Sequence, residues 1–121
     1  MIIKKPAFEF EDERGIFKEI IRGEGWEELN FAVRYKGVNS GNHYHKKTLE
    51  LFYVISGKGN VKIKNINTGE EKIYQFSKND IFIVEPYEMH NLDYEEDTTF
   101  AILLSIPHNK DNPDIFEYED S

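Results

Sequence analysis

The chain is a series of short hydrophobic runs separated by turn residues. The runs are rich in Val, Ile, Phe and Tyr, recur about every 8 to 12 residues, and are bounded by Gly, Asn and Asp, as strands and turns are. The predicted strands cover residues 16–21, 31–35, 51–55, 61–64, 71–76, 81–84, 90–94 and 98–106. No long helical period is present, so the pattern predicts an all-β sandwich or barrel.

The polarity of single strands predicts how they are buried. Residues 51–55 are apolar on both faces, which is typical of a strand between two layers. Residues 61–64 alternate, so Val61 and Ile63 should face inward while the lysines stay in water. Residues 31–35 also alternate, with Phe31, Val33 and Tyr35 on one face.

Length and composition predict one globular domain. The chain has 121 residues, 39% of them hydrophobic, and contains no repeat or linker. We expect a single domain over residues 1–121, with a core at about residues 28–106. Residues 107–121 form an acidic tail, for which we expect solvation or loose docking. The alternative for the tail is an edge strand that pairs across a dimer.

Charge excludes some partners. The net charge is −8, from 23 acidic and 15 basic residues without a basic stripe, which argues against nucleic acid and anionic membranes as partners. Cysteine is absent from the sequence, so disulfides and thiolate metal sites are excluded. The first residues lack an apolar signal core and no run of 18 apolar residues occurs, so the default expectation is a cytoplasmic protein.

Four side chains are candidate ligands of one divalent metal ion: His43, His45, Glu50 and His90. In an extended strand His43 and His45 share a face, about 7 Å apart along the chain. Glu50 opens the next apolar run, so a turn could return it to the histidines, whereas His90 must arrive from far along the chain. Imidazoles with one carboxylate suit Fe, Ni, Mn, Co or Zn and leave positions open for a substrate. The alternative is a relic in which the four groups only satisfy one another; His108 is expected to be solvated and is outside this set.

Two segments carry a resemblance to a known superfamily. Residues 37–57 match G-x5-H-x-H-x4-E-x6-G, the first cupin motif, at every fixed position. Residues 79–94 resemble the second motif, G-x5-P-x-G-x2-H-x3-N, in spacing. There Asn79 replaces the first Gly, Glu85 the Pro, Tyr87 the second Gly and Tyr94 the final Asn. The resemblance to cupins implies a double-stranded β-helix, that is, a jelly-roll barrel, and by analogy a homodimer.

A finer resemblance covers roughly residues 8 to 105. The elements Asp12-Glu-Arg-Gly-Ile-Phe17 and Gly41-Asn-His-Tyr-His45 are similar to those of cupins that act on nucleotide-linked sugars. These are deoxysugar 3,5-epimerases, 3,4-ketoisomerases and the cupin half of capsular-polysaccharide reductases. In the first two, the resemblance implies a histidine base and an incomplete metal set. Ser40 replaces an arginine that often precedes the Gly-Asn-His turn, and Glu50 and His90 complete a metal set here.

The leading hypothesis is a metal-dependent enzyme on a small polar molecule, such as an isomerase or epimerase of a nucleotide-linked sugar. The alternatives are an iron-dependent dioxygenase and a non-catalytic cupin that binds or senses a small ligand. The sequence assigns no catalytic residue; the weak candidates nearest to the ligands are Tyr44, Tyr53, Tyr87 and Glu88. The parity of Tyr44 and Tyr53 relative to the neighbouring ligands favours an outward, structural role. For Arg14, a surface ion pair is favoured over contact with a substrate phosphate.

Overall fold

The computed structural model describes residues 1–119, which form two antiparallel sheets and a separate hairpin. The first sheet contains, in spatial order, β1 (Ile2–Lys4), β9 (Ile81–Val84), β6 (Glu50–Ser56), β11 (Thr98–Leu104) and β4 (Glu28–Arg34). The second contains β12 (Phe116–Glu117), β5 (Asn39–Tyr44), β10 (Glu88–Tyr94), β7 (Lys58–Asn65) and β8 (Glu71–Ser77). The hairpin pairs β2 (Phe8–Asp12) with β3 (Gly15–Glu19). The predicted all-β architecture is confirmed.

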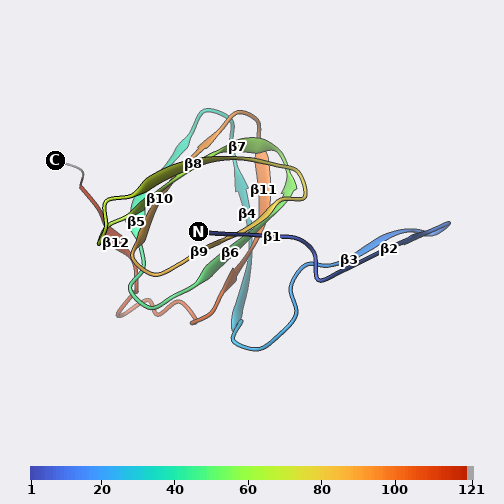
Figure 1. Ribbon diagram of the computed structural model, residues 1–121, viewed down its shortest axis with the longest axis horizontal. Coiled ribbons are helices and arrows are strands. Elements are labelled where there is room, and N and C mark those ends of the chain that lie inside the picture. The colour runs from blue at the N-terminus through green and yellow to red at the C-terminus, as the bar shows by residue number, and fades with distance from the viewer. Residues whose placement is uncertain (120–121) are drawn as a thin grey trace.

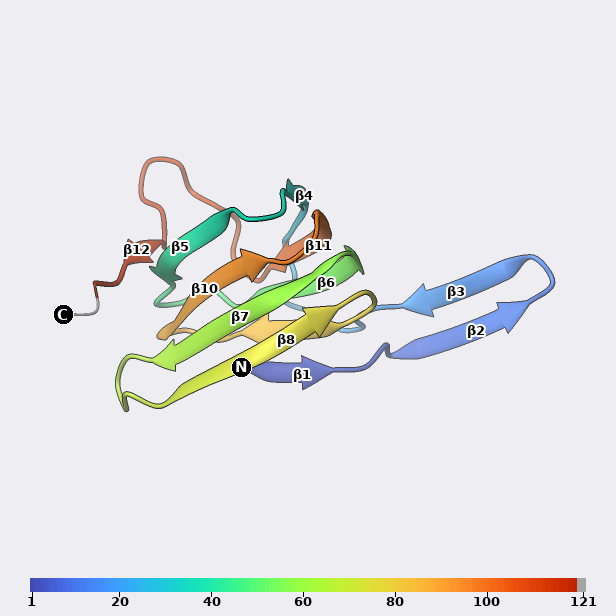
Figure 2. The same ribbon diagram turned by 90° about the horizontal axis from the view of Figure 1, so that it is seen from above.

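The two sheets curve around a common interior, and the hairpin projects from one side of the barrel (Figures 1 and 2). Each of the eight strands expected from the periodicity is present, with bounds that differ by a few residues. The described residues include no helix, and therefore none of the length and apolarity needed to cross a membrane.

Apolar side chains from both sheets fill the interior. The core residues are Phe52, Val54, Val61, Ile63, Phe76, Phe82, Val84, Leu92, Tyr94 and Phe100. The rings of Phe52 and Phe82 stack at 4.9 Å between centroids, and Phe100 meets Phe52 edge-on at 5.3 Å. Val61 and Ile63 face inward as predicted. The burial of these aromatic and aliphatic side chains stabilises the packing of the two sheets.

The outer face of the first sheet is only partly covered. Leu51, Ile81 and Ile83 are buried there, with Ile20, Ile21 and Trp26 packed against them. On this face of β6, Leu51 is buried as predicted, but Tyr53 is only half-buried and Ile55 is exposed. Strand β4 lies at the edge of this sheet, and its outward side chains are exposed. We call Leu29, Phe31, Val33 and Tyr35 the β4 stripe; they are exposed by 70%, 71%, 40% and 67%.

Part of the C-terminal segment is docked within the chain, which differs from the expectation of a solvated or loosely docked tail only at residues 114–118. Strand β12 pairs with β5, with Phe116 opposite Tyr44 and Glu117 opposite His43. The Asp114 carboxylate accepts hydrogen bonds from the backbone N–H groups of residues 46 to 48, at 2.9 to 3.0 Å. Residues 107–113 are exposed, in line with a solvated tail, whereas residues 114–118 are docked; the sequence did not indicate this docking because the partners lie more than 60 residues away. Residues 120 and 121 lie outside the described part of the chain.

Two residues that replace motif glycines adopt the conformation that favours glycine. Asn79 has φ 76° and Tyr87 has φ 63°, both in the left-handed region. Asn tolerates this region, whereas a bulky side chain such as Tyr is strained there. The backbone N–H of Tyr87 donates to the carbonyl of His45 at 2.7 Å, which links the second motif to the first. The turn geometry of the motif is therefore kept although its glycines are absent.

Candidate functional site

His45, Glu50 and His90 form a compact cluster inside the barrel. Their ligand atoms lie within 4.8 Å of one another. The Nε2 atoms of His45 and His90 are each 3.4 Å from Oε1 of Glu50. His45 follows β5, Glu50 is the first residue of β6, and His90 lies within β10, so the cluster joins the two sheets. Three of the four predicted ligands are brought together.

Both imidazoles are oriented by backbone carbonyl groups. Nδ1–H of His45 donates to the carbonyl oxygen of Asp114 at 2.6 Å, and Nδ1–H of His90 donates to that of Glu88 at 3.3 Å. This assignment of the protons follows from the hydrogen-bond partners. In the neutral rings Nε2 is then the atom with a free lone pair, and both Nε2 atoms face Glu50. Such carbonyl partners are the usual means by which proteins orient metal-binding histidines.

The cluster fixes the charge of its carboxylate. Burial raises the pKa of Glu50, but the hydrogen bonds and charges of His45 and His90 outweigh it and lower that pKa to about 2. Burial lowers the pKa of His45, whereas Glu50 and Asp114 raise it, and the net pKa is above the ordinary value. Glu50 is therefore ionised at neutral pH, beside an imidazole that takes up a proton readily.

His43 is not part of this cluster of three among residues 1–119, but it lines the same interior. A cavity of about 110 Å³ lies against Glu50 and His90; its other lining residues are Arg34, Ser40, His43, Phe52, Leu92, Tyr94, Phe100 and Ile102. His43 pairs with His90 across the β5–β10 ladder. The cavity therefore has a polar rim and floor, while its remaining wall is apolar, as is typical of small-molecule sites.

A β-bulge decides which side chains of β5 reach this cavity. The pairing of β5 with β10 changes register between His90 opposite His43 and Leu92 opposite Ser40. In a regular strand, residues three apart point to opposite faces. Because β5 has one extra residue here, both Ser40 and His43 line the cavity. Sequence parity alone would have placed Ser40 outside.

The weak catalytic candidates lie outside the cavity lining. The Tyr44 ring packs on Phe116, 5.5 Å between centroids, and the Tyr53 hydroxyl donates to Asn79 at 3.2 Å. For Tyr87, the structure shows a strained backbone conformation in the turn before β10 and no place in the cavity lining. The carboxylate of Glu88 binds the N-terminal ammonium group and accepts from a backbone N–H at 2.8 Å, although its own carbonyl orients His90.

Exposed His108 lines a smaller hollow beside His45 and Glu50, under the C-terminal segment.

Sequence reasoning missed four further residues of the site. These are Arg34, Ser40 and Tyr94 in the cavity, and Asp114, which orients His45. Tyr94 was visible as the residue at the last position of the second motif, and Ser40 as the replaced arginine. Arg34 and Asp114 carried no such signal, because only tertiary contacts bring them to the site.

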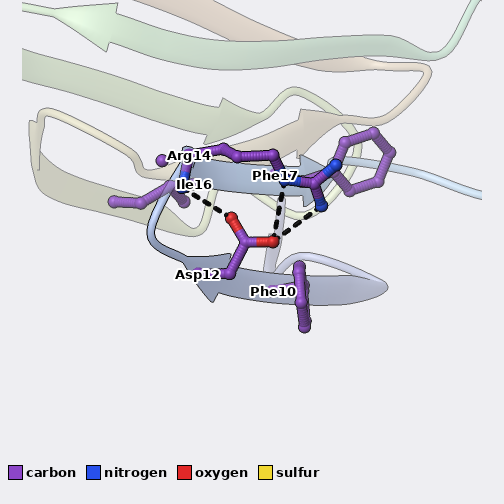
Figure 3. Close-up of a pocket in the computed structure, with 6 residues that line it drawn as sticks. Phe10, Asp12, Arg14, Ile16 and Phe17 are labelled. Carbon is purple, nitrogen blue, oxygen red and sulfur yellow. Dashed lines mark hydrogen bonds and ion pairs between the residues drawn. The ribbon is translucent and has the colours of Figure 1, made fainter.

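The projecting hairpin holds a larger, open hollow of about 290 Å³ around Phe10, Asp12, Arg14, Ile16 and Phe17. Figure 3 shows the guanidinium of Arg14 bound to the carboxylate of Asp12, with contacts of 2.6 and 2.9 Å. The predicted surface ion pair is confirmed. Because this hollow contains no histidine and lies away from the barrel interior, we place the chemistry in the cavity instead.

Solved structures with this fold act on or bind nucleotide-linked sugars. The 3,4-ketoisomerase QdtA from Thermoanaerobacterium thermosaccharolyticum, in complex with TDP, is 16% identical with a TM-score of 0.77; the alignment covers 97% of this chain and 87% of QdtA. The dTDP-6-deoxy-D-glucose-3,5-epimerase RmlC from Legionella pneumophila, in complex with dTDP-4-keto-L-rhamnose, is 20% identical with a TM-score of 0.78 and coverage of 95% and 70%. At these identities they establish the fold, and the predicted cupin jelly roll is confirmed.

Two further comparisons bear on the family. CapF, the capsular polysaccharide assembling protein of Staphylococcus aureus, is 25% identical with a TM-score of 0.72; the match covers 95% of this chain but only 35% of CapF. No curated protein matches the sequence. The family model described as the polysaccharide biosynthesis C-terminal domain matches residues 10–116, which is most of the chain. The chain therefore belongs to the family of polysaccharide biosynthesis C-terminal domains.

Proposed function

We propose that this domain isomerises or epimerises a nucleotide-linked keto-sugar in the cavity beside the His/Glu cluster. The observation that carries the proposal is the cavity itself, in which two histidines, His43 and His90, lie with Glu50 against a partly apolar wall. QdtA and RmlC, which share the fold, are a sugar ketoisomerase and a sugar epimerase. The family of polysaccharide biosynthesis domains is consistent with a sugar substrate.

The proposed reaction needs a base next to an acidic C–H bond. A carbonyl group acidifies the hydrogen on the neighbouring carbon, and a base that removes it leaves an enolate. Return of the proton to the opposite face of that carbon gives an epimer, whereas proton shifts across the enediol give the isomeric ketone. His43 is the proposed base, because its imidazole lines the cavity and is outside the cluster of three. In that position it can exchange protons without disturbing Glu50.

The cluster is also suited to a divalent metal ion. Two ligand atoms that each lie about 2.1 Å from an ion are roughly 3.0 to 3.4 Å apart. The separations of 3.4 Å from Glu50 to both imidazoles fit this, as do the two carbonyl-bound Nδ1–H groups. His45, Glu50 and His90 would hold Fe, Ni, Mn, Co or Zn. When bound, such an ion supplies Lewis-acid polarisation of a substrate oxygen.

The test is exchange of carbon-bound hydrogen with solvent. TDP-4-keto-6-deoxyglucose, the ligand of a QdtA structure, serves as the probe. In D₂O we expect the domain to catalyse uptake of deuterium next to the carbonyl, followed by mass spectrometry. His43→Gln should abolish this uptake, and His108→Gln serves as the matched control. Uptake no faster than in a protein-free sample would refute the proposed function.

A homodimer is part of the proposal. The β4 stripe and four hairpin side chains, Phe8, Phe10, Ile16 and Phe17, are between 40% and 71% exposed. Large apolar side chains are enriched in the cores of such interfaces, so these two surfaces are the proposed contacts with a second copy. An isolated two-stranded hairpin is marginally stable in water, so contact with a second copy would also stabilise this arm.

A further inference from the structure

Three polar side chains outside the cluster line the same cavity. Arg34 is the last residue of β4, Ser40 lies in β5, and Tyr94 is the last residue of β10. All three line the cavity that also contacts Glu50 and His90. Across the bulge, Ser40 and His43 lie opposite Leu92 and His90 of β10, which are two residues apart, or about 7 Å along a strand. The two sets of polar groups therefore face one small cavity of about 110 Å³.

The chemistry of this end is that of a hydrogen-bond donor site. The hydroxyl groups of Ser40 and Tyr94 are 2.7 Å apart, so one of them donates to the other. The remaining O–H hydrogen can then be donated to an oxygen atom in the cavity. Arg34 adds a guanidinium group, which has donors and no acceptor. The lining of the cavity therefore combines donors and a positive charge with the carboxylate of Glu50.

Burial holds one of these groups, the Tyr94 hydroxyl, in place, whereas Ser40 is half-buried and Arg34 is exposed. Tyr94 is 4% exposed and packs against Phe76 and Phe100, so its ring is held in place. Burial raises the pKa of Tyr94, although Ser40 and Arg34 oppose this, and the net pKa remains above the usual range. Its hydroxyl therefore keeps its proton at neutral pH. Donors that are held in position stabilise a developing oxyanion more than water does, because they need no reorientation.

We infer that Arg34 and the Tyr94–Ser40 hydroxyl pair form the oxygen-binding end of the cavity, which holds the carbonyl oxygen of a keto-sugar and stabilises the negative charge of its enolate. The inference rests on the proposed function and specifies the substrate class as one whose carbonyl points away from Glu50. When a base in the cavity takes the proton from carbon, the electron pair of the C–H bond moves to the carbonyl oxygen. The donors of Arg34 and Tyr94 then face that charge, and return of the proton restores them unchanged.

The experiment measures deuterium uptake into TDP-4-keto-6-deoxyglucose over a range of concentrations, which separates kcat from KM. Tyr94→Phe keeps the buried ring and removes the hydroxyl. Arg34→Gln removes the charge at an exposed position, and Arg34→Lys restores it without the fork. We expect Tyr94→Phe and Arg34→Gln to lower kcat by about 100-fold or more, with a small change in KM, and Arg34→Lys to recover part of the loss.

Matched controls carry the same exchanges elsewhere. Tyr74→Phe alters a half-buried tyrosine of β8, and Arg22→Gln alters a guanidinium that binds Glu19 beside the hairpin. Both should retain the wild-type rate, and the melting temperature of every variant reports folding. If Tyr94→Phe and Arg34→Gln exchange at the wild-type rate while His43→Gln does not, the oxygen-binding end is refuted and the proposed function stands. If the wild-type domain gives no exchange, the proposed function and this inference fall together.

Discussion

Glu50 determines the electrostatics of the cluster. Its carboxylate lies 3.4 Å from Nε2 of both imidazoles and has a pKa of about 2, so it stays ionised over the whole range in which histidine titrates. The two imidazoles compete for this one negative charge. A divalent cation can bind the carboxylate and both neutral imidazoles at the same time. Protons can neutralise the carboxylate's charge only by converting the imidazoles to imidazolium ions.

Removal of a cluster residue should remove the proposed metal. We expect His45→Gln, Glu50→Gln and His90→Gln each to lower the affinity for Zn²⁺ or Fe²⁺ by at least about 100-fold, because each loses a ligand and even outer partners cost 10- to 100-fold. His43→Gln should retain the metal, since His43 is outside the cluster of three. His108→Ala is the control. Metal content is measured by elemental analysis; equal loss in His43→Gln would restore the four-ligand set, and equal content in all variants would remove the site.

The affinity for metal should decrease as the pH is lowered. The decrease should begin at a higher pH than it would for histidines with an ordinary pKa. In the metal-free protein the pKa of His45 is raised, so a proton competes for Nε2 at pH values at which an unperturbed imidazole, with a pKa of about 6.5, is neutral. As pH falls from about 7 to 5 the ion must displace more protons and binds less tightly. Titration calorimetry with Zn²⁺ at several pH values measures this. Equal affinity at both ends of the range would argue against imidazole ligation.

At the scale of elements, the C-terminal segment binds the turn between β5 and β6 and thereby fixes His45. Asp114 binds the turn between β5 and β6 through its carboxylate, including the Thr48 hydroxyl at 2.8 Å, and orients His45 through its carbonyl. Strand β12 then extends the second sheet beyond β5. Since one residue makes both sets of contacts, the geometry of His45 depends on the docking of this segment.

Asp114→Ala should therefore weaken the docking of the C-terminal segment. Loss of the carboxylate leaves the N–H groups of residues 46–48 without their partner, so we expect about 1–3 kcal/mol of destabilisation, measured by urea unfolding. Hydrogen exchange at the β12 amides should also accelerate. Asp111→Ala, in the same exposed segment, is the control. Unchanged exchange in β12 would contradict the role of Asp114.

The same contact predicts a dependence on acid. Burial raises the pKa of Asp114, but the hydrogen bonds from the turn lower it below the ordinary value of 3.8. A carboxyl with a lowered folded pKa contributes stability that is present above its unfolded pKa and is lost as pH falls through the folded value. We expect wild-type stability to drop more than that of Asp114→Asn below about pH 4 in acid titrations. Parallel curves would show that the carboxylate is not linked to folding.

At the scale of the whole molecule, the exposed apolar surface is the main unexplained feature of a domain with a net charge of −8. The β4 stripe lies on the edge strand of a sheet, where exposed apolar residues are a liability unless they are covered. Phe31→Glu should therefore raise the dissociation constant of the proposed dimer more than about tenfold, because dimerisation would then bury a charged carboxylate. Analytical ultracentrifugation measures the shift. Ile73→Glu, at a side chain of β8 that is 73% exposed, is the control; a wild-type monomer at high concentration would refute the dimer.

The hydrophobic period determined the strands that carry the core. Residues 81–84 were predicted with their observed bounds, and the inward positions Val61 and Ile63 followed from alternation. The His-x-His pattern and the first motif also brought His45, Glu50 and His90 together correctly. These features are local, or follow from a spacing that the pleat of a strand converts directly into direction.

Tertiary structure decided what local pattern does not encode. The short strands β1 and β12 exist through pairing with β9 and β5, and their sequences alone carry too few residues to fix a period. The bulge in β5 depends on register with β10, and it alone brings Ser40 to the cavity. Asp114 and Arg34 reach the site across long separations in the chain. The sequence by itself thus determined the strands and the cluster, because periodicity is a local property, whereas register and strand ends were decided by pairing between distant segments.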